Sequence, residues 1–210
     1  MKFQYNPPVI VKKMFPSFRW ESKVKKILLT FDDGPVPGLT ELILRKLSDN
    51  NIKGLFFCVG SNIKKYPSLI EDIIKEGHCL GNHTYNHTNL TSPDFNPIVE
   101  IDGINRYIYD KYGIEIKYFR PPHGRFNLYT NKILKERNMV NVMWSLLSYD
   151  FTGDLSKVKM SVSWCLQNNS IVVLHDNIKS GNIISDSIDY IVREAEIKGL
   201  SFGEPVECLN

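Results

Sequence analysis

Short apolar runs alternate along the chain with longer stretches in which apolar residues recur at helical spacing. KILLTF (26–31) and SIVVLHD (170–176) have no helical period, so each run predicts a β-strand. Residues 39–50 instead repeat their apolar side chains at helical spacing, which predicts a helix. The full pattern predicts strands at 26–31, 53–60, 78–84, 116–122, 140–148, 170–176 and 200–209, and helices at 39–50, 68–77, 97–112, 128–138, 155–168 and 184–198.

This alternation of strand and helix predicts parallel strands joined by crossover helices. The strand runs are continuously apolar, as expected when both faces of a sheet are covered. Such units build either a closed (β/α) barrel of about seven strands or an open doubly wound sheet. No GxGxxG follows the first strand, so a dinucleotide site lacks its main support.

Composition and charge narrow the classes of partner. The chain has 210 residues with 42% hydrophobic side chains, enough for one domain with a sizeable core. Residues 1–24, rich in proline and aromatic side chains, are expected to be an irregular lead-in to a domain at 25–210. The net charge of +3 is spread without a long basic run, which excludes nucleic acid as the expected partner.

The sequence leaves the compartment open. No run approaches the roughly 20 apolar residues that a transmembrane helix needs. The N-terminal residues contain no apolar h-region, so no secretory signal peptide is predicted. The chain is cytoplasmic as written, and extracytoplasmic if a leader has been removed.

Polar side chains collect just after the predicted strands. The carboxyl ends of parallel strands share one edge of a barrel or sheet, where sites are built. Five strands therefore deliver carboxylates, imidazoles and a guanidinium to one rim. These residues are Asp32, Asp33, Asn82, His83, His87, Arg120, Asp150, His175 and Asp176.

Two of these groups have the chemistry of a metal site. His83 and His87 are four residues apart, which on a helical turn would place both imidazoles on one face. Two imidazoles and a carboxylate suit zinc or a similar divalent ion, and Asp32 or Asp33 could supply the oxygen. Successive side chains in an extended segment point in opposite directions, so one aspartate can bind metal while its neighbour faces substrate as a base.

The remaining rim residues suit acid–base chemistry. Arg120 could pair with a carboxylate through its planar guanidinium. His175 is a natural general acid because its ordinary pKa lies near neutrality. Asp150 could hold His175 in its charged form; Asp176 is either a partner of that histidine or a helix cap.

Five motifs resemble those of the polysaccharide deacetylase family, also called the NodB-homology domain or carbohydrate esterase family four. They occur in the family's order: TFDDGP (30–35), HTYNH (83–87), RPPHG (120–124), SYDF (148–151) and VVLHD (172–176). The first two are highly specific together, and the resemblance runs from about residue 26 to about residue 200. It implies an α/β fold, a distorted (β/α) barrel of about seven parallel strands, with residues 25–210 as the catalytic domain.

The resemblance also implies a role for each matched residue. Asp33, His83 and His87 would be the metal ligands, with Zn²⁺ as the expected ion and Co²⁺ or another transition metal as alternatives. Asp32 would be the general base and Arg120 the residue that positions it. His175 would be the general acid and Asp150 the carboxylate that tunes it. His123, Phe151 and Val173 would border the substrate pocket, and the backbone near His123 would help to bind the oxyanion.

Three positions depart from the family's usual pattern and bear on substrate fit. Leu147 stands where members often have an aspartate, Phe151 where tryptophan is usual, and His123 where tyrosine or phenylalanine is common. The implied reaction is hydrolysis of N-acetyl groups on N-acetylglucosamine-containing glycans of the chitooligosaccharide or peptidoglycan type. The alternatives are an O-acetyl esterase acting on acetylated xylan-like polysaccharide, a non-catalytic carbohydrate-binding domain, and a hydrolase of small non-sugar amides.

Overall fold

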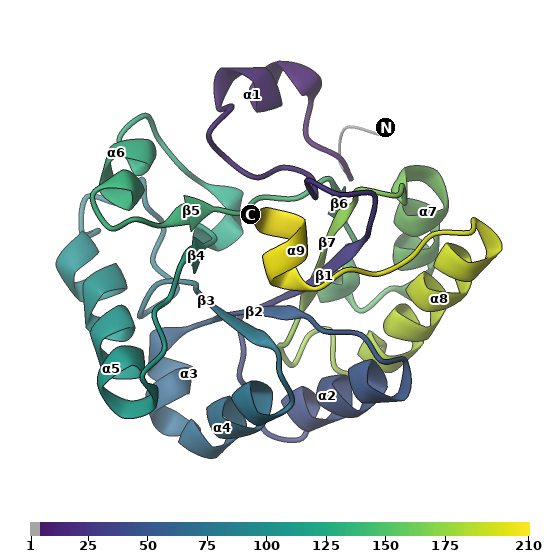
Figure 1. The fold of residues 1–210 in the computed structure, drawn as a ribbon, viewed down its shortest axis with the longest axis horizontal. Helices are drawn as coiled ribbons and strands as arrows, with labels where there is room; N and C mark the ends of the chain where they lie inside the picture. Colours follow the sequence, from purple (N-terminus) through teal and green to yellow (C-terminus); the bar gives the residue numbers. More distant parts are fainter. Residues whose placement is uncertain (1–4) are drawn as a thin grey trace.

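The computed structural model describes residues 5–210, in which seven parallel strands form one curled sheet (Figure 1). The strand order across the sheet is β5-β4-β3-β2-β1-β7-β6. The strands are β1 (Leu28–Asp32), β2 (Leu55–Cys58), β3 (Cys79–Asn82), β4 (Tyr118–Phe119), β5 (Val140–Asn141), β6 (Leu146–Leu147) and β7 (Ile171–His175). This arrangement confirms the predicted distorted (β/α) barrel.

Helices surround the sheet in a ring (Figure 1). The helices are α1 (Val9–Met14), α2 (Leu39–Asp49), α3 (Gly60–Lys65), α4 (Pro67–Lys75), α5 (Gly103–Tyr112), α6 (Thr130–Lys135), α7 (Leu155–Cys165), α8 (Ile184–Ile197) and α9 (Pro205–Leu209). A π-helical turn, η2 (Ile98–Asp102), precedes α5, and 3-10 turns lie at η3 (Pro122–Gly124) and η4 (Asp150–Thr152).

The interior strand β1 shows why the strand runs do not alternate between apolar and polar residues. All five of its residues are buried. Leu29 and Phe31 belong to the large cluster between the sheet and the helices, whereas Leu28 belongs to a cluster inside the barrel with Leu55 and Ile171. Because successive side chains point to opposite faces, both faces must be apolar when both are covered.

The predicted strand at 200–209 is wrong. Phe202 forms only an isolated bridge to Ile27, and the chain then turns into α9, with Pro205 at its first position. Proline fits the first turn of a helix because its missing N–H would have no helical partner there. Cys208 and Leu209 join the interior cluster with Leu28, so α9 fills the barrel at the start of β1 (Figure 1).

The predicted strand at 140–148 is also wrong, because it is two strands on opposite edges of the sheet. β5 pairs with β4, and β6 pairs with β7. Between them, Val142 forms a parallel bridge with Arg19, so the lead-in lies across the gap between the two edges. Met143, between β5 and β6, bonds through its N–H to the Arg19 carbonyl and through its own carbonyl to the Arg120 guanidinium, so its backbone groups are not available to a strand ladder.

The lead-in is more ordered than expected where the structure describes it, from residue 5 onward. It contains the short helix α1, and Phe18 and Trp20 are buried against Met143. Residues 1–4 of the predicted lead-in lie outside the described residues, and the division of the chain at residue 24 stays a prediction. The helix α3 was not predicted.

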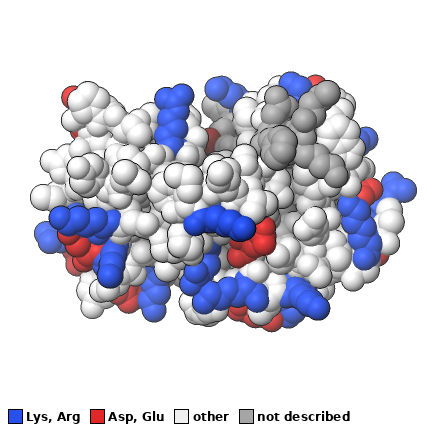
Figure 2. Space-filling view, turned by 90° about the horizontal axis from the view of Figure 1, so that it is seen from above, with Lys and Arg blue, Asp and Glu red and all other residues white. Residues whose placement is uncertain are grey.

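The surface carries mixed charge. On the face that Figure 2 shows, Lys and Arg side chains are scattered among Asp and Glu, without one continuous patch of either sign. Of the helices in residues 5–210, none combines the length and the apolar character that a bilayer crossing demands.

Candidate metal and catalytic site

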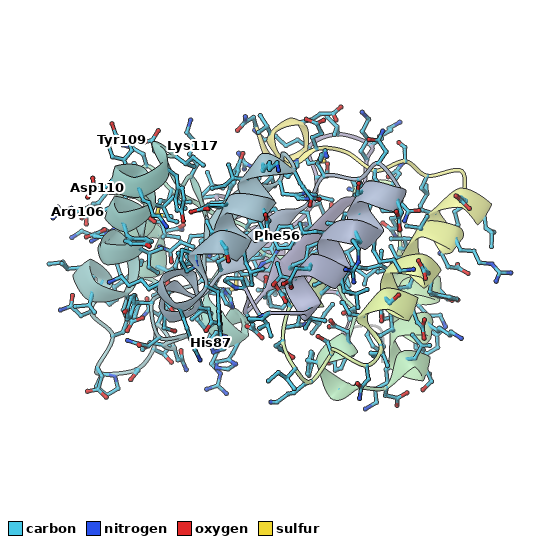
Figure 3. The ribbon with its side chains drawn as sticks, turned by 90° about the horizontal axis from the view of Figure 1, so that it is seen from below. Phe56, His87, Arg106, Tyr109, Asp110 and Lys117 are labelled. Atoms are coloured by element: carbon cyan, nitrogen blue, oxygen red, sulfur yellow. The ribbon has the colours of Figure 1, made fainter. Side chains whose placement is uncertain are left out.

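A cavity of about 340 Å³ opens at the carboxyl ends of the strands. Figure 3 shows His87, which lines the cavity, at one edge of the molecule. Lys117, which directly precedes β4, lies at the opposite edge, so the cavity is on the side where the strands end and not where they begin. The residues that line the cavity are Asp32, Asp33, His83, His87, His123, Gly124, Trp144, Leu147, Phe151, Val173, His175, Asn177 and Lys179. Of the residues to which the resemblance gave a role, Arg120 and Asp150 alone do not line it; they bond to the lining residues Asp32 and His175. Asn82 and Asp176, which were also expected at this rim, do not line the cavity.

Asp33, His83 and His87 converge at one point of this cavity. Asp33 Oδ1 lies 3.5 Å from His83 Nε2 and 3.1 Å from His87 Nε2, and one ligand atom from each residue falls within 4.8 Å of the others. His83 Nδ1 lies 2.8 Å from the Arg120 carbonyl oxygen, which fixes the proton on Nδ1 and leaves Nε2 as a lone-pair donor. The donor set fits zinc, which takes imidazole nitrogen and carboxylate oxygen.

The two histidines reach this point from a loop, and the premise that they lie on a helical turn is wrong. Residues 83–88 contain no helix, and Thr84 and His87 have φ angles of 64° and 57°. These left-handed conformations are uncommon outside glycine. His83 directly follows β3, and the left-handed turns bring His87 back toward it, so that their ring centroids lie 5.0 Å apart.

Asp33 adopts a φ of 80°, which turns its side chain away from that of Asp32. Its Oδ2 accepts a 2.6 Å hydrogen bond from Asn177 Nδ2, and its carbonyl accepts one from Asn62. Burial acts to raise the pKa of Asp33, but its contacts with His83 and His87 outweigh burial and hold that pKa well below its usual range. The carboxylate is therefore charged.

Asp32 is paired with a fully buried arginine. Arg120 Nη1 donates to Asp32 Oδ1 at 2.8 Å, and Asp32 itself is only 5% exposed. The same guanidinium donates to the hydroxyl of Thr30 and to the carbonyls of Val142 and Met143. Because a planar guanidinium with all these acceptors has one orientation, it fixes the direction of the Asp32 carboxylate.

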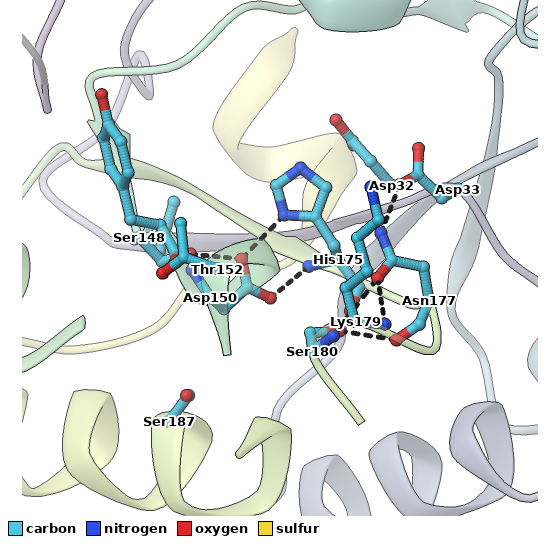
Figure 4. Close-up of polar contacts among 12 residues, drawn as sticks. Asp32, Asp33, Ser148, Asp150, Thr152, His175, Asn177, Lys179, Ser180 and Ser187 are labelled. Atoms are coloured by element: carbon cyan, nitrogen blue, oxygen red, sulfur yellow. Dashed lines mark hydrogen bonds and ion pairs between the residues drawn. The ribbon is translucent and has the colours of Figure 1, made fainter. Parts of the chain in front are cut away.

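On the other side of the cavity, His175 is held by Asp150. The carboxylate accepts from His175 Nδ1 at 2.7 Å and from the His175 backbone N–H at 2.7 Å (Figure 4). Ser148 also donates its hydroxyl to Asp150 Oδ1. Burial alone would lower the pKa of His175, but the charge and hydrogen bond of Asp150 raise it to about 9, with Asp32 and Asp33 adding to the effect.

Asp176 has neither of the roles considered for it. Thr40 donates its hydroxyl to Asp176 Oδ2 at 2.7 Å, whereas the partner of His175 is Asp150. Burial raises the pKa of Asp176 to about 7, although the bond from Thr40 acts the other way. A Cβ at Gly34 would lie 2.1 Å from Asp176 Oδ2, so the turn after the paired aspartates requires glycine.

The apolar wall of the cavity combines predicted and unpredicted residues. Phe151 packs edge-on against the ring of His175, and Val173 is almost fully buried beside them. His123 contacts the ring of His87, with centroids 4.6 Å apart. Sequence reasoning noted Leu147 only as a departure and missed Gly124, Trp144, Asn177 and Lys179 as lining residues. Gly124 is the last residue of the motif RPPHG and Asn177 directly follows VVLHD, which is the signal that could have identified them.

Comparison with known proteins agrees with this geometry. Residues 20–142 match the family model described as Polysaccharide deacetylase. A peptidoglycan-N-acetylglucosamine deacetylase of Bacillus cereus is 32% identical over 202 residues, covering 91% of this chain and 71% of the relative. The Bacillus subtilis peptidoglycan-N-acetylmuramic acid deacetylase PdaA is 34% identical over 152 residues, covering 71% of this chain and 58% of that relative.

A solved structure extends the comparison to three dimensions. The Bc1960 peptidoglycan N-acetylglucosamine deacetylase, in complex with 4-naphthalen-1-yl-N-oxidanyl-benzamide, matches with a TM-score of 0.81 and 29% identity. The match covers 89% of this chain and 90% of that one. The resemblance drawn from the five motifs is confirmed. The chain therefore belongs to the polysaccharide deacetylase family of enzymes.

Proposed function

We propose that this protein is a metal-dependent hydrolase that removes N-acetyl groups from N-acetylglucosamine-containing glycans of the peptidoglycan or chitooligosaccharide type. One observation carries the proposal: a three-ligand cluster, an arginine-held carboxylate and a carboxylate-held histidine face the same cavity. The names of the peptidoglycan deacetylases to which the chain is similar support the choice of glycan.

Asp33, His83 and His87 would hold the ion, for which Zn²⁺ is the first candidate. Co²⁺ is the alternative because it accepts the same imidazole and carboxylate ligands. When bound, such an ion supplies Lewis acidity, which polarises a carbonyl group and makes a water molecule more acidic. The Arg120 carbonyl, which binds His83 Nδ1, and the side chain of Asn177, which binds Asp33, keep the ligand atoms directed toward one point.

Asp32 acts as the general base in this proposal. Arg120 occupies its Oδ1, whereas Oδ2 has no hydrogen-bond partner among residues 5–210. The free oxygen takes a proton from the attacking water while the water oxygen forms a bond to the acetyl carbon. The guanidinium keeps the carboxylate oriented until that step.

His175 acts as the general acid. Its Nδ1 is committed to Asp150, so the proton available to substrate is on Nε2. With a pKa of about 9, the ring is charged at neutral pH and carries that proton. The proton moves to the amide nitrogen as the carbon–nitrogen bond breaks, and the products are acetate and a free amine. An amide nitrogen leaves poorly unless it is protonated, so the acid is essential for this substrate.

The acetyl methyl group is assigned to the apolar wall made by Phe151, Val173 and Leu147. Leu147 makes this wall less polar than an aspartate would. His123, with φ 57°, lies on the opposite side near the proposed ligands, where its backbone N–H is the candidate oxyanion donor.

The test is acetate release by metal-stripped and zinc-restored protein from chitooligosaccharide, peptidoglycan and acetylated xylan. We expect release from the first two only after zinc is restored. Release from xylan alone would favour the O-acetyl esterase, whereas binding of glycan without release of acetate would favour a carbohydrate-binding domain. Release from none of these glycans but from a small non-sugar amide would favour that hydrolase. Asp32→Asn is the matched control, because it keeps the shape of the base and should lower the rate at least ~10²-fold.

A further inference from the structure

Glu100 is a buried acid outside the cavity that contacts the loop carrying the two histidines. It lies on the π-helical turn η2 and is 5% exposed. Its Oε2 accepts from the backbone N–H groups of Tyr85 and Asn86, both at 2.9 Å. Its Oε1 accepts from Asn86 Nδ2 and from the Thr88 hydroxyl, both at 3.0 Å. Four donors from one short loop therefore converge on a single carboxylate.

That loop adopts a conformation that its residues do not favour. Thr84 and His87 both have positive φ, and neither is glycine. Such conformations persist when the surroundings over-determine them. Two side-chain oxygens of the segment hold its ends, because Thr84 N–H donates to Asn82 Oδ1 and Thr88 N–H donates to Thr84 Oγ1. The N–H groups of Gly60 and Ser61 also donate to the carbonyls of Thr84 and Tyr85. The bonds to Glu100 hold Tyr85, Asn86 and Thr88, the residues on either side of His87 included.

The two histidines differ in how they are fixed. His83 is 2% exposed, and its second ring nitrogen contacts the Arg120 carbonyl. The side chain of His87 is 30% exposed, and no hydrogen bond to its Nδ1 is found within residues 5–210. Besides its contacts with Asp33 and with the ring of His123, the His87 ring is placed by its backbone, between Asn86 and Thr88, which both bond to Glu100.

We propose that Glu100 is a positioning residue for the metal site, acting through the backbone of the loop to place His87 against Asp33 and His83. The inference rests on the proposed metal-dependent function and adds to it a residue outside the cavity. η2 supplies the only four-donor acceptor for this loop among the described residues. A π-turn at this place fits the observation that such turns occur often at functional sites.

The substitutions follow from the hydrogen bonds. Glu100→Ala leaves all four donors without their acceptor. Glu100→Gln keeps one oxygen, which can still accept from the Tyr85 and Asn86 N–H groups, and so should preserve part of the function. Thr88→Val removes a single donor. The matched control is Asp102→Asn, because Asp102 lies two residues further along the same turn but binds Arg137 at 2.6 and 2.9 Å.

The experiment measures Zn²⁺ affinity by competition with a chromophoric chelator, and the visible absorption spectrum of the Co²⁺-loaded protein. Circular dichroism of the metal-free variants checks that each is folded. We expect Glu100→Ala to bind Zn²⁺ about 10–100-fold more weakly, as for other groups that orient metal ligands, and to alter the Co²⁺ spectrum. Glu100→Gln and Thr88→Val should show smaller losses in the same direction, and Asp102→Asn none.

Wild-type affinity and an unchanged Co²⁺ spectrum in the folded Glu100 and Thr88 variants would overturn the inference while leaving the proposed function intact. If Glu100→Ala does not fold, the Gln and Val variants decide in the same way. An equal loss in Asp102→Asn would also overturn it, because the effect would then belong to the turn as a whole. Absence of Zn²⁺ binding by the wild-type protein would overturn both this inference and the proposed function.

Discussion

Two histidines beside strand ends, the buried His78 and the half-buried His175, have pKa values shifted in opposite directions. His175 ends β7 beside the cavity, where Asp150 raises its pKa to about 9. His78 lies just before β3, where its Nδ1 accepts from the Gly54 N–H at 3.0 Å. Burial, with a smaller effect from Lys53, lowers the pKa of His78 to about 4.

The two pKa values differ because of the nearest carboxylate, since burial acts to lower the pKa of both histidines. Asp150 is fully buried and lies 2.7 Å from His175, so water screens little of the attraction. The nearest acid to His78 is Glu76, which is 40% exposed and 3.9 Å away, and His78 Nε2 has no hydrogen-bond partner. Burial therefore favours the neutral form of His78, whereas a buried carboxylate partner favours the charged form of His175, the proposed general acid.

Replacing each histidine by alanine should give the largest difference between the two, with His175 affecting the rate and His78 affecting stability. His175→Ala should lower the rate of N-deacetylation at least ~10²-fold, since the leaving nitrogen would lack its proton donor. His78→Ala should leave kcat unchanged but destabilise the fold by about 1–3 kcal/mol, because the buried Gly54 N–H loses its acceptor. Steady-state kinetics and urea unfolding of the two variants check this. Near-full activity of His175→Ala would refute its role as acid.

Removing the partner should make His175 resemble His78. In Asp150→Asn the shape is kept but the negative charge is lost, so we expect the pKa of His175 to fall from about 9 to below its ordinary 6.5. NMR titration of the metal-free protein measures this directly, and the alkaline limb of the kcat–pH profile should move to lower pH. The same substitution at Asp102 is the control. A pKa that stays near 9 would contradict the assigned cause.

The pH dependence of stability should show the two histidines in separate windows. His175 has a raised pKa, so its contribution is complete below about pH 6.5 and is lost as the pH rises toward 9, on the order of 3 kcal/mol in total. His78 has a lowered pKa, so its contribution is complete above about pH 6.5 and is lost as the pH falls toward 4. Urea unfolding of metal-free protein at a series of pH values tests this. His175→Ala should remove the pH dependence of the unfolding free energy between about pH 6.5 and 9, and His78→Ala that between about pH 4 and 6.5.

The smallest effect is expected from a charge beside His78. Lys53 acts to lower the pKa of His78, so Lys53→Gln should raise it slightly from about 4, with burial still keeping it below 6.5. An NMR titration of the His78 ring measures the shift. Lys198→Gln, at the end of α8, is a control in which no shift is expected. A rise to the ordinary value would mean that Lys53, and not burial, dominates.

The sequence was most informative where chemistry and strand ends coincide. The apolar runs predicted the strands near 26–31, 53–60, 78–84 and 170–176, and the motif residues lie around one cavity as expected. The expected roles of these residues stay predictions.

The features that the sequence could not predict depend on tertiary structure. The segment 140–148 resembles one apolar run, and the bonds of Met143 to Arg19 and Arg120, both distant in sequence, lie where it is interrupted between β5 and β6. The loop 83–88 was misread as helical because spacing of four residues does not reveal left-handed backbone angles. Glu100 was missed because a buried acid that binds backbone N–H groups resembles any helical glutamate in the sequence.

Arg120 bonds at once to β1 through Thr30 and Asp32 and, through Val142 and Met143, to the connection between the two open edges of the sheet. The orientation of the Asp32 carboxylate, the proposed base, thus depends on the position of the segment that connects the two open edges of the sheet. The bridge between Arg19 and Val142 lies in this same connection. We therefore expect a change that separates the two open edges, including loss of that bridge, to shift Arg120 and with it the carboxylate of Asp32.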